Sequence, residues 1–354
     1  MNERTEHAMN SIPEGGRQEI YDAVVIGGGA AGLSGALTLG RARRSVLVVD
    51  AGHPRNAPAD GVHAYLGREG TPPGELLAAG RAEVRGYGGE FITAAATGAE
   101  RDGGVFRVFL SDGSDLRARR LLVTTGVVDE LPDVPGLADL WGSDVLHCPY
   151  CHGWEVRDRA IGILGTGPLA VHQALLWRQW SADVTLFVHT MDEPDEDQYE
   201  ELAARGVSVV IGEVASLETR DGRLLGVRLA SGTLIRRHVL AVATKMTAGA
   251  ELLASLGLEP TDLEMAGAVI GSRIAADPTG ATDVPGVWVA GNVTSPTDQV
   301  VAAAAAGVRA GAAINADLIA EETRRAVAER RAPFSAHLER EVCEVVLGDR
   351  RHGL

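Results

Sequence analysis

The sequence contains little cysteine and few aromatic side chains: three cysteines among 354 residues, and 4% Phe, Trp and Tyr. So little cysteine argues against a disulfide-stapled secreted domain and indicates a reducing compartment, which we expect to be the cytoplasm. Residues 1–20 hold no apolar signal-peptide core, so we expect a disordered leader there. The Ala-rich run 300–320 is interrupted by Arg309 and Asp317, so we expect no membrane span.

An excess of basic residues is also lacking. The chain has 33 Lys and Arg against 48 Asp and Glu, a net charge of −15, so no nucleic-acid partner is expected. The composition is 45% hydrophobic, with 44 glycines, which favours α/β packing with many tight turns. The length predicts about two domains.

A glycine-rich turn follows the first apolar run, residues 21–26. The order is strand, turn (GGGAAG, 27–32) and helix, and a second strand, 45–49, ends in an acid. This arrangement is typical of a dinucleotide site, in which the backbone approaches a pyrophosphate and the acid binds a ribose hydroxyl. The candidate residues are Gly27, Gly29, Ala30, Ala31, Gly32 and Asp50.

The same architecture returns later in the chain. Residues 160–164 lead into GTGPLA (165–170), and the segment 104–126 resembles the segment 222–244. We expect the strand 286–292 to return to the first of these two copies. We therefore expect an α/β fold of two Rossmann-like nucleotide-binding domains, the second inserted in the first. The expected boundaries are 21–130 and 250–325 for the first domain, 131–249 for the second and 326–354 for a helical tail.

Two cysteines three residues apart, Cys148 and Cys151, stand between two histidines, His147 and His152. Such a pair can cycle between dithiol and disulfide, and a neighbouring imidazolium lowers a thiol pKa. Zinc binding and two inert buried thiols are the alternatives. No second ligand pair accompanies the first, because the remaining cysteine, Cys343, stands alone, so we expect no metal.

These motifs, together with VTTG at 123–126 and GVWVAGN at 286–292, resemble the low-molecular-weight thioredoxin reductases. That is a family of FAD-dependent pyridine nucleotide-disulfide oxidoreductases, and the match runs from about residue 21 to about residue 320. The resemblance implies a homodimer in which Cys151 reacts with the flavin and Cys148 with the substrate. The implied FAD residues, besides those of the first turn and Asp50, are Ala51, Arg55, Asn56, His63, Thr125, Gly126, Gly291, Asn292, Gln299 and Val300.

The sequence departs from that family at two points. His152 stands where the family has an Asp proton donor, and an imidazole suits acid–base work near neutral pH. The strand 184–188 is followed by His189, Asp192 and Glu193 with no Arg or Lys, which argues against NADPH because a 2′-phosphate would be repelled. NADH stays open, since the glycines of the second turn are kept.

These departures favour the branch of the family that oxidises dithiols in natural products of the holomycin and gliotoxin type. The leading hypothesis is a dithiol oxidase that passes electrons from a small-molecule dithiol to O₂, giving H₂O₂. The alternative is an NAD(P)H-dependent reductase of a thioredoxin-like protein. A third hypothesis is a redox sensor acting through the tail, where Leu338, Val342, Val345 and Val346 predict an amphipathic helix. We expect that helix to bury its apolar face.

Overall fold

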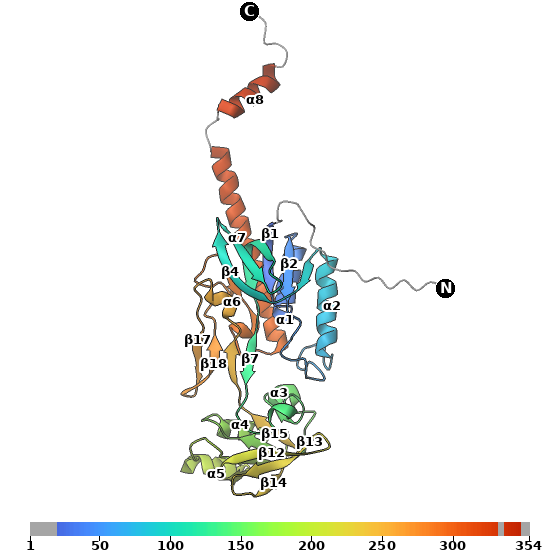
Figure 1. Ribbon diagram of the computed structural model, residues 1–354, viewed down its shortest axis with the longest axis vertical. Coiled ribbons are helices and arrows are strands. Elements are labelled where there is room, and N and C mark those ends of the chain that lie inside the picture. Colours follow the sequence, from blue (N-terminus) through green and yellow to red (C-terminus); the bar gives the residue numbers. More distant parts are fainter. Residues whose placement is uncertain (1–19, 332–335, 348–354) are drawn as a thin grey trace, which may run out of the picture. The chain divides into compact units, whose positions relative to one another are not determined.

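A computed structural model describes residues 20–331 and 336–347 (Figure 1). The expected leader lies outside the described residues, except for Ile20, which begins the first strand. The chain forms two compact units, one ending at Ile314 and one beginning at Asn315. Each unit is described by itself.

The first sheet of the first unit has the strand order β3-β2-β1-β6-β5-β4, with β19 paired to β6. Strands β3, β2, β1, β6 and β19 run parallel, whereas β4, β5 and β6 form an antiparallel meander. Helices α1 (Ala30–Arg41), α2 (Pro73–Gly86) and the start of α7 (Val300–Arg331) belong to the same fold. The strands are β1 (Ile20–Ile26), β2 (Val46–Asp50), β3 (Glu90–Thr93), β4 (Ala96–Asp102), β5 (Val105–Leu110), β6 (Asp115–Val123) and β19 (Val287–Val289).

A second, fully parallel sheet has the order β11-β10-β9-β15-β8. Helices α4 (Ala170–Trp177) and α5 (Glu196–Ala204) belong to it, and α5 begins with a capping box between Asp195 and Gln198. An antiparallel sheet, β12-β13-β14, accompanies it. The strands are β8 (Val145–Leu146), β9 (Ile161–Leu164), β10 (Val184–Phe187), β11 (Ser208–Val210), β12 (Val214–Arg220), β13 (Arg223–Leu229), β14 (Leu234–Arg236) and β15 (Val239–Val242).

The chain passes between these two sheets on a pair of adjacent strands. Strand β7 (Val127–Glu130) runs antiparallel to β16 (Lys245–Ala248), and Glu130 lies opposite Lys245. With β17 (Thr261–Met265) and β18 (Ala268–Arg273) they form a four-stranded sheet, and α6 (Glu251–Ala254) follows β16. The second Rossmann-like domain is thus inserted in the first Rossmann-like domain, and the expected fold class is confirmed.

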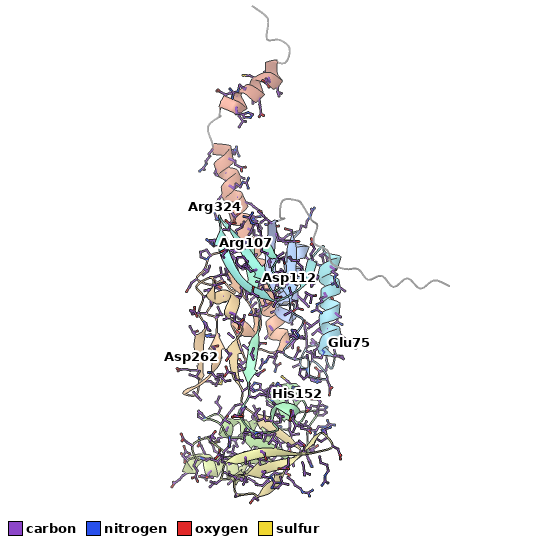
Figure 2. All side chains as sticks on the ribbon, viewed as in Figure 1. Glu75, Arg107, Asp112, His152, Asp262 and Arg324 are labelled. Atoms are coloured by element: carbon purple, nitrogen blue, oxygen red, sulfur yellow. The ribbon has the colours of Figure 1, made fainter. Side chains whose placement is uncertain are left out.

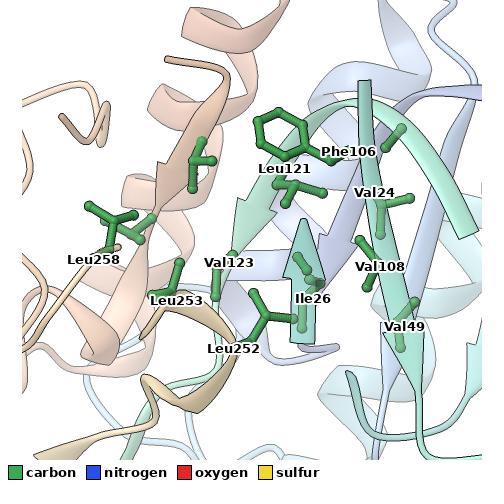
Figure 3. Close-up of a cluster of buried hydrophobic side chains, with 14 of the residues drawn as sticks. Val24, Ile26, Val49, Phe106, Val108, Leu121, Val123, Leu252, Leu253 and Leu258 are labelled. Carbon is green, nitrogen blue, oxygen red and sulfur yellow. The ribbon is translucent and has the colours of Figure 1, made fainter. Parts of the chain in front are cut away.

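The core of the first sheet contains aliphatic side chains and the ring of Phe106, many of which come from β1, β2, β5 and β6 (Figure 3). Val24, Val108 and Leu121 are fully buried. Leu253 of α6, which follows the inserted domain in the sequence, belongs to the same cluster. Each such side chain contributes roughly 1.5–3 kcal/mol of transfer free energy. The core therefore depends on segments from both ends of the chain.

A buried carboxylate joins the second sheet to β13. Asp144, just before β8, has no exposed side-chain surface. It accepts hydrogen bonds from Nε and Nη2 of Arg223 at 2.8 and 2.7 Å and from the Leu224 N–H at 2.9 Å. These contacts hold the pKa of Asp144 below its ordinary value, although burial opposes the shift.

The second unit contains the rest of α7 and helix α8 (Ala336–Leu347). The expected helix forms, but Leu338, Val342, Val345 and Val346 are all exposed, so the prediction that its apolar face is buried is wrong for the described chain. Within the described ranges, no helix combines the length and the apolar character needed to cross a membrane.

Candidate active site

A cavity of about 770 Å³ opens in the first unit, between the glycine turn after β1 and the cysteine pair. It is lined by every residue that the sequence nominated for the site except Gly32. These residues come from positions as far apart as Gly27 and Val300, so the fold assembles one site from distant segments. Their roles in binding FAD stay predictions.

The glycine turn leaves room for a phosphate. Gly27 has a φ of +106°, which favours glycine, and none of the described atoms lies within 4 Å of a Cβ built on Gly29. Helix α1 begins at Ala30, and no described side chain caps it, so its first N–H groups face the cavity. Gly32 serves packing, because a Cβ there would lie 1.9 Å from the Gly27 carbonyl oxygen. The turn therefore fits the pyrophosphate of FAD.

The acid at the end of β2 has a partner that sequence reasoning missed. Asp50 lines the cavity, and its Oδ2 accepts a short hydrogen bond from Nη2 of Arg81 on α2. A Cβ on Gly28 would lie 2.5 Å from the same oxygen, so the middle glycine of the motif is also needed. Arg81 orients the Asp50 carboxylate. The Oδ1 atom of Asp50 can still accept a hydrogen bond from a ribose hydroxyl.

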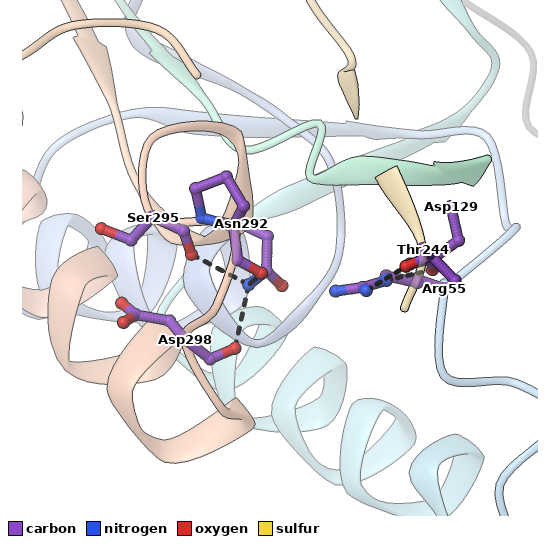
Figure 4. Close-up of polar contacts among 7 residues, drawn as sticks. Arg55, Asp129, Thr244, Asn292, Ser295 and Asp298 are labelled. Carbon is purple, nitrogen blue, oxygen red and sulfur yellow. Dashed lines mark hydrogen bonds and ion pairs between the residues drawn. The ribbon is translucent and has the colours of Figure 1, made fainter. Parts of the chain in front are cut away.

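Asn292, in the 3₁₀ turn η2 (Gly291–Val293), also lines the cavity. Its Nδ2 donates to the carbonyl oxygens of Ser295, Pro296 and Asp298 at 3.1, 3.0 and 2.9 Å (Figure 4). These bonds hold the loop that leads into α7, where Gln299 and Val300 line the cavity. Asn292 thus positions the residues that were expected to approach the flavin.

The cysteines lie at the short helix α3 (Pro149–His152), with Cys148 as its N-cap. The two Sγ atoms are 2.7 Å apart, and the Cys151 thiol donates to Cys148. This hydrogen bond lowers the pKa of Cys148 to about 7, whereas the same bond, with burial, raises the pKa of Cys151. Cys148 is therefore the thiolate of the reduced pair.

Aromatic side chains pack against the turn that carries the cysteine pair. The rings of Tyr150 and Trp180 meet edge to face, 5.5 Å apart, and a Cβ on Gly153 would lie 2.8 Å from the Trp180 ring. Trp177, fully buried, packs against Trp180 in turn. Three of the fifteen aromatic residues, Tyr150, Trp177 and Trp180, thus pack at the turn that carries the thiols.

Both flanking histidines line the cavity and are half-buried. Burial lowers the pKa of His147 and of His152, so the neutral imidazoles predominate at neutral pH. The Nδ1 atom of His147 is buried and has no hydrogen-bond partner among the described residues.

A cation lies close to the thiols. Arg55 Nε and Nη2 each donate to Asp129 at 2.6 Å, and Thr244 Oγ1 donates to the same carboxylate at 2.7 Å (Figure 4). Arg55 lowers the pKa of both cysteines through its charge. Asp129, on β7, has no sequence signal as a site residue, because only the fold brings it to the loop that carries Arg55.

Comparisons with known proteins agree with this geometry. Residues 21–308 match the family model described as pyridine nucleotide-disulphide oxidoreductase. The chain is 30% identical to thioredoxin reductase tcpT of Claviceps purpurea, over 85% of this chain and 95% of that protein. It is 31% identical to thioredoxin reductase sirT of Leptosphaeria maculans, over 84% and 94%.

Solved structures show the same likeness. The crystal structure of HlmI is 46% identical, with a TM-score of 0.82 over 89% of this chain and 99% of that chain. An oxidoreductase from Agrobacterium tumefaciens is 36% identical, with a TM-score of 0.79 over 85% and 99%. The expected resemblance to the thioredoxin reductases is confirmed. The chain therefore belongs to the pyridine nucleotide-disulphide oxidoreductases, a family of FAD-binding oxidoreductase enzymes.

Proposed function

We propose that the protein is an FAD-dependent dithiol oxidase. It forms a disulfide in a small-molecule dithiol and passes the electron pair through Cys148, Cys151 and FAD to O₂, giving H₂O₂. The observation that carries the proposal is that the thiols and the first glycine turn share one cavity, whereas residues 184–193, which follow the second glycine turn, hold Asp192 and Glu193 and no Lys or Arg.

The second glycine turn lies after β9. The Gly165 carbonyl accepts hydrogen bonds from the N–H groups of Thr190 and Met191, both at 3.1 Å. A Cβ on Gly165 would lie 2.6 Å from Sδ of Met191, so this side chain packs directly on the turn. In a Rossmann unit a nucleotide occupies this edge of the sheet. The following acids, Asp192 and Glu193, add negative charge where NADPH would bring a phosphate.

The sulfur chemistry is a balanced exchange. A substrate thiolate attacks Sγ of Cys148 in the oxidised pair, the S–S bond breaks, and Cys151 leaves as the thiolate. The second substrate thiol then attacks the mixed disulfide and releases Cys148, so the substrate loses two electrons and the cysteine pair gains them. FAD, when held at the first glycine turn, would supply the acceptor for that electron pair and its route to oxygen.

The surrounding charges support the leaving groups. Arg55 favours the thiolate form of both cysteines, and the Cys151 thiol stabilises the Cys148 thiolate by its hydrogen bond. His147 and His152, neutral because of burial, can hold a proton released in the exchange. The site thus has the groups needed to move thiol protons.

Anaerobic mixing of the purified flavoprotein tests the proposal. Dithiothreitol should bleach the visible flavin absorbance, and admission of oxygen should restore it with one H₂O₂ per dithiol oxidised. Cys148→Ser should lose both effects, and Cys343→Ser should keep them. A flavin that dithiothreitol leaves oxidised while NADPH or NADH bleaches it would refute the proposal.

An NAD(P)H-dependent disulfide reductase is the second candidate. Relatives named thioredoxin reductase favour it, as does Gly167 in the second turn, where none of the described atoms lies within 4 Å of a built Cβ. The same stopped-flow experiment separates the two candidates, because they differ in which reductant reaches the flavin.

A further inference from the structure

The loop between β2 and α2 brings a histidine and a carboxylate to the cavity. His63 lines the cavity, and its Nδ1 lies 2.6 Å from Oε1 of Glu69. Its Nε2 lies 3.7 Å from Oε1 of Glu155, which follows the turn that carries the cysteines. His63 therefore stands between its own loop and the cysteine turn.

The loop backbone is arranged around this pair. Ala64 has a φ of +56°, a conformation that costs free energy for a residue other than glycine. Its N–H donates to the second oxygen of Glu69 at 2.9 Å, and Val62 pairs with Thr71 to close the loop. Both oxygens of Glu69 are thus used, one to hold the backbone and one to hold the imidazole.

The bond between His63 and Glu69 selects one tautomer. With Nδ1–H donated to the carboxylate, the lone pair of the ring lies on Nε2, which is the arrangement of the histidine base in serine hydrolases. The hydrogen bond from His63 lowers the pKa of Glu69, so the carboxylate stays ionised at neutral pH. A carboxylate bound in this way fixes the orientation of the imidazole.

Burial favours the neutral form of the other two histidines of the cavity. Burial lowers the pKa of both His147 and His152. The charges near His63 are those of Glu69 on its own loop, Glu155 and His152 on the cysteine turn, and Asp60, which also acts on His152. Among the described contacts, His63 is the one imidazole of the three that forms a hydrogen bond with a carboxylate.

We propose that His63, oriented by Glu69, is the base that removes the proton from the incoming thiol of a small-molecule dithiol. This inference rests on the proposed dithiol oxidase function. The thiol takes the place of Glu155 at Nε2, its proton moves to Nε2, and the thiolate sulfur attacks Sγ of Cys148. The Cys148–Cys151 bond breaks, a substrate–Cys148 bond forms, and Cys151 carries the released electron pair as a thiolate.

Stopped-flow reduction of the holoenzyme by dithiothreitol, without oxygen, tests the base. His63→Gln should lower the rate constant at neutral pH by about 10²-fold, the usual contribution of a general base. The remaining rate should rise about tenfold per pH unit up to the thiol pKa, because the dithiol must then ionise unaided. Glu69→Gln, which keeps the imidazole, should lower the rate about tenfold, as expected for a lost orienting carboxylate.

Matched controls come from residues that do not line the cavity. Glu75 on α2 (Figure 2) and His172 on α4 are both exposed, and Glu75→Gln and His172→Gln should react at the wild-type rate. Flavin content and unfolding midpoint are measured for each variant. These readouts separate a loss of proton transfer from a loss of cofactor or of folding.

The outcomes divide cleanly. If dithiothreitol does not bleach the wild-type flavin, the proposed function fails and the base has no reaction to serve. If the wild type is bleached and His63→Gln shows the same rate and pH profile, the inference is overturned. If His63→Gln loses flavin, Glu69→Gln decides, since a wild-type rate and profile in that variant overturns the inference.

Discussion

The hydrogen bond between the two thiols should control the reactivity of Cys148. Removing the donor with Cys151→Ala should raise the pKa of Cys148 from about 7 toward its ordinary value of 9.0. Cys151→Ser, which keeps a hydroxyl donor, is the matched comparison. Both changes are made with Cys343→Ser, so that Cys148 is the remaining cysteine of the three.

The size of the effect follows from ionisation and nucleophilicity together. A rise of about 2 pKa units corresponds to about 2.7 kcal/mol. The thiolate fraction at pH 7 then falls about 50-fold, but a more basic thiolate attacks faster, by roughly 6- to 10-fold for a Brønsted slope near 0.4–0.5. The net rate of disulfide exchange at pH 7 should fall about 5- to 8-fold.

The assay follows the release of thiopyridone when Cys148 reacts with dithiodipyridine over a range of pH. The midpoint of the rate profile should be higher for Cys151→Ala than for Cys151→Ser, and the plateau at high pH should be faster. Equal midpoints near 7 would show that the Cys151 donor does not set the pKa. Arg55 and the backbone N–H groups of Tyr150 and Cys151 would then be the cause.

Three further predictions concern the glycine turn after β1, the buried Asp144 carboxylate and the pH dependence of stability at His147. Gly32→Ala should fail to fold, because its Cβ meets a backbone oxygen at 1.9 Å, whereas Gly29→Ala should fold and lose flavin content; circular dichroism and flavin absorbance check both. Asp144→Ala should lower the free energy of unfolding in urea by about 3 kcal/mol, because the buried Leu224 N–H loses its acceptor while Arg223 can turn to water. Burial lowers the pKa of His147, so its contribution to stability should be intact above the unfolded value of 6.5 and lost as pH falls through the lower folded pKa. Urea unfolding at several pH values, with His147→Asn as the comparison, should show a shallower pH dependence in the variant.

Local patterns were sufficient to predict the elements that form the site. The apolar run 21–26 followed by GGGAAG predicts strand, turn and helix from neighbouring residues alone, and the structure contains β1 and α1 there. The spacing of Cys148 and Cys151 likewise predicts a reactive pair without knowledge of the fold. Residues such as Asn292 were placed at the cavity only through the family resemblance, since nothing local marks them.

The partners of the site residues could not be predicted in this way. Arg81, Asp129 and Glu69 act through side chains that reach across an irregular loop or between separate elements. Their pairing depends on backbone conformations such as that of Ala64, which no periodic pattern encodes.

The second glycine turn is the clearest limit of motif reasoning. GTGPLA has the glycines of a nucleotide cradle, and the sequence alone left NADH open for that reason. In the structure, Met191 after β10 packs on Gly165, whereas Gly167 has no described atom within 4 Å of a built Cβ. The motif describes the turn but not the side chains that the chain after β10 places beside it.

The antiparallel pairing of β7 with β16 brings the two ends of the inserted domain side by side. Glu130 and Lys245 face each other across two strands, which is the geometry that a tight hairpin turn closes. A two-residue link between them would keep the remaining strand order of the first sheet intact. The core cluster of the first sheet contains none of residues 131–244, so such a shortened chain would keep that cluster.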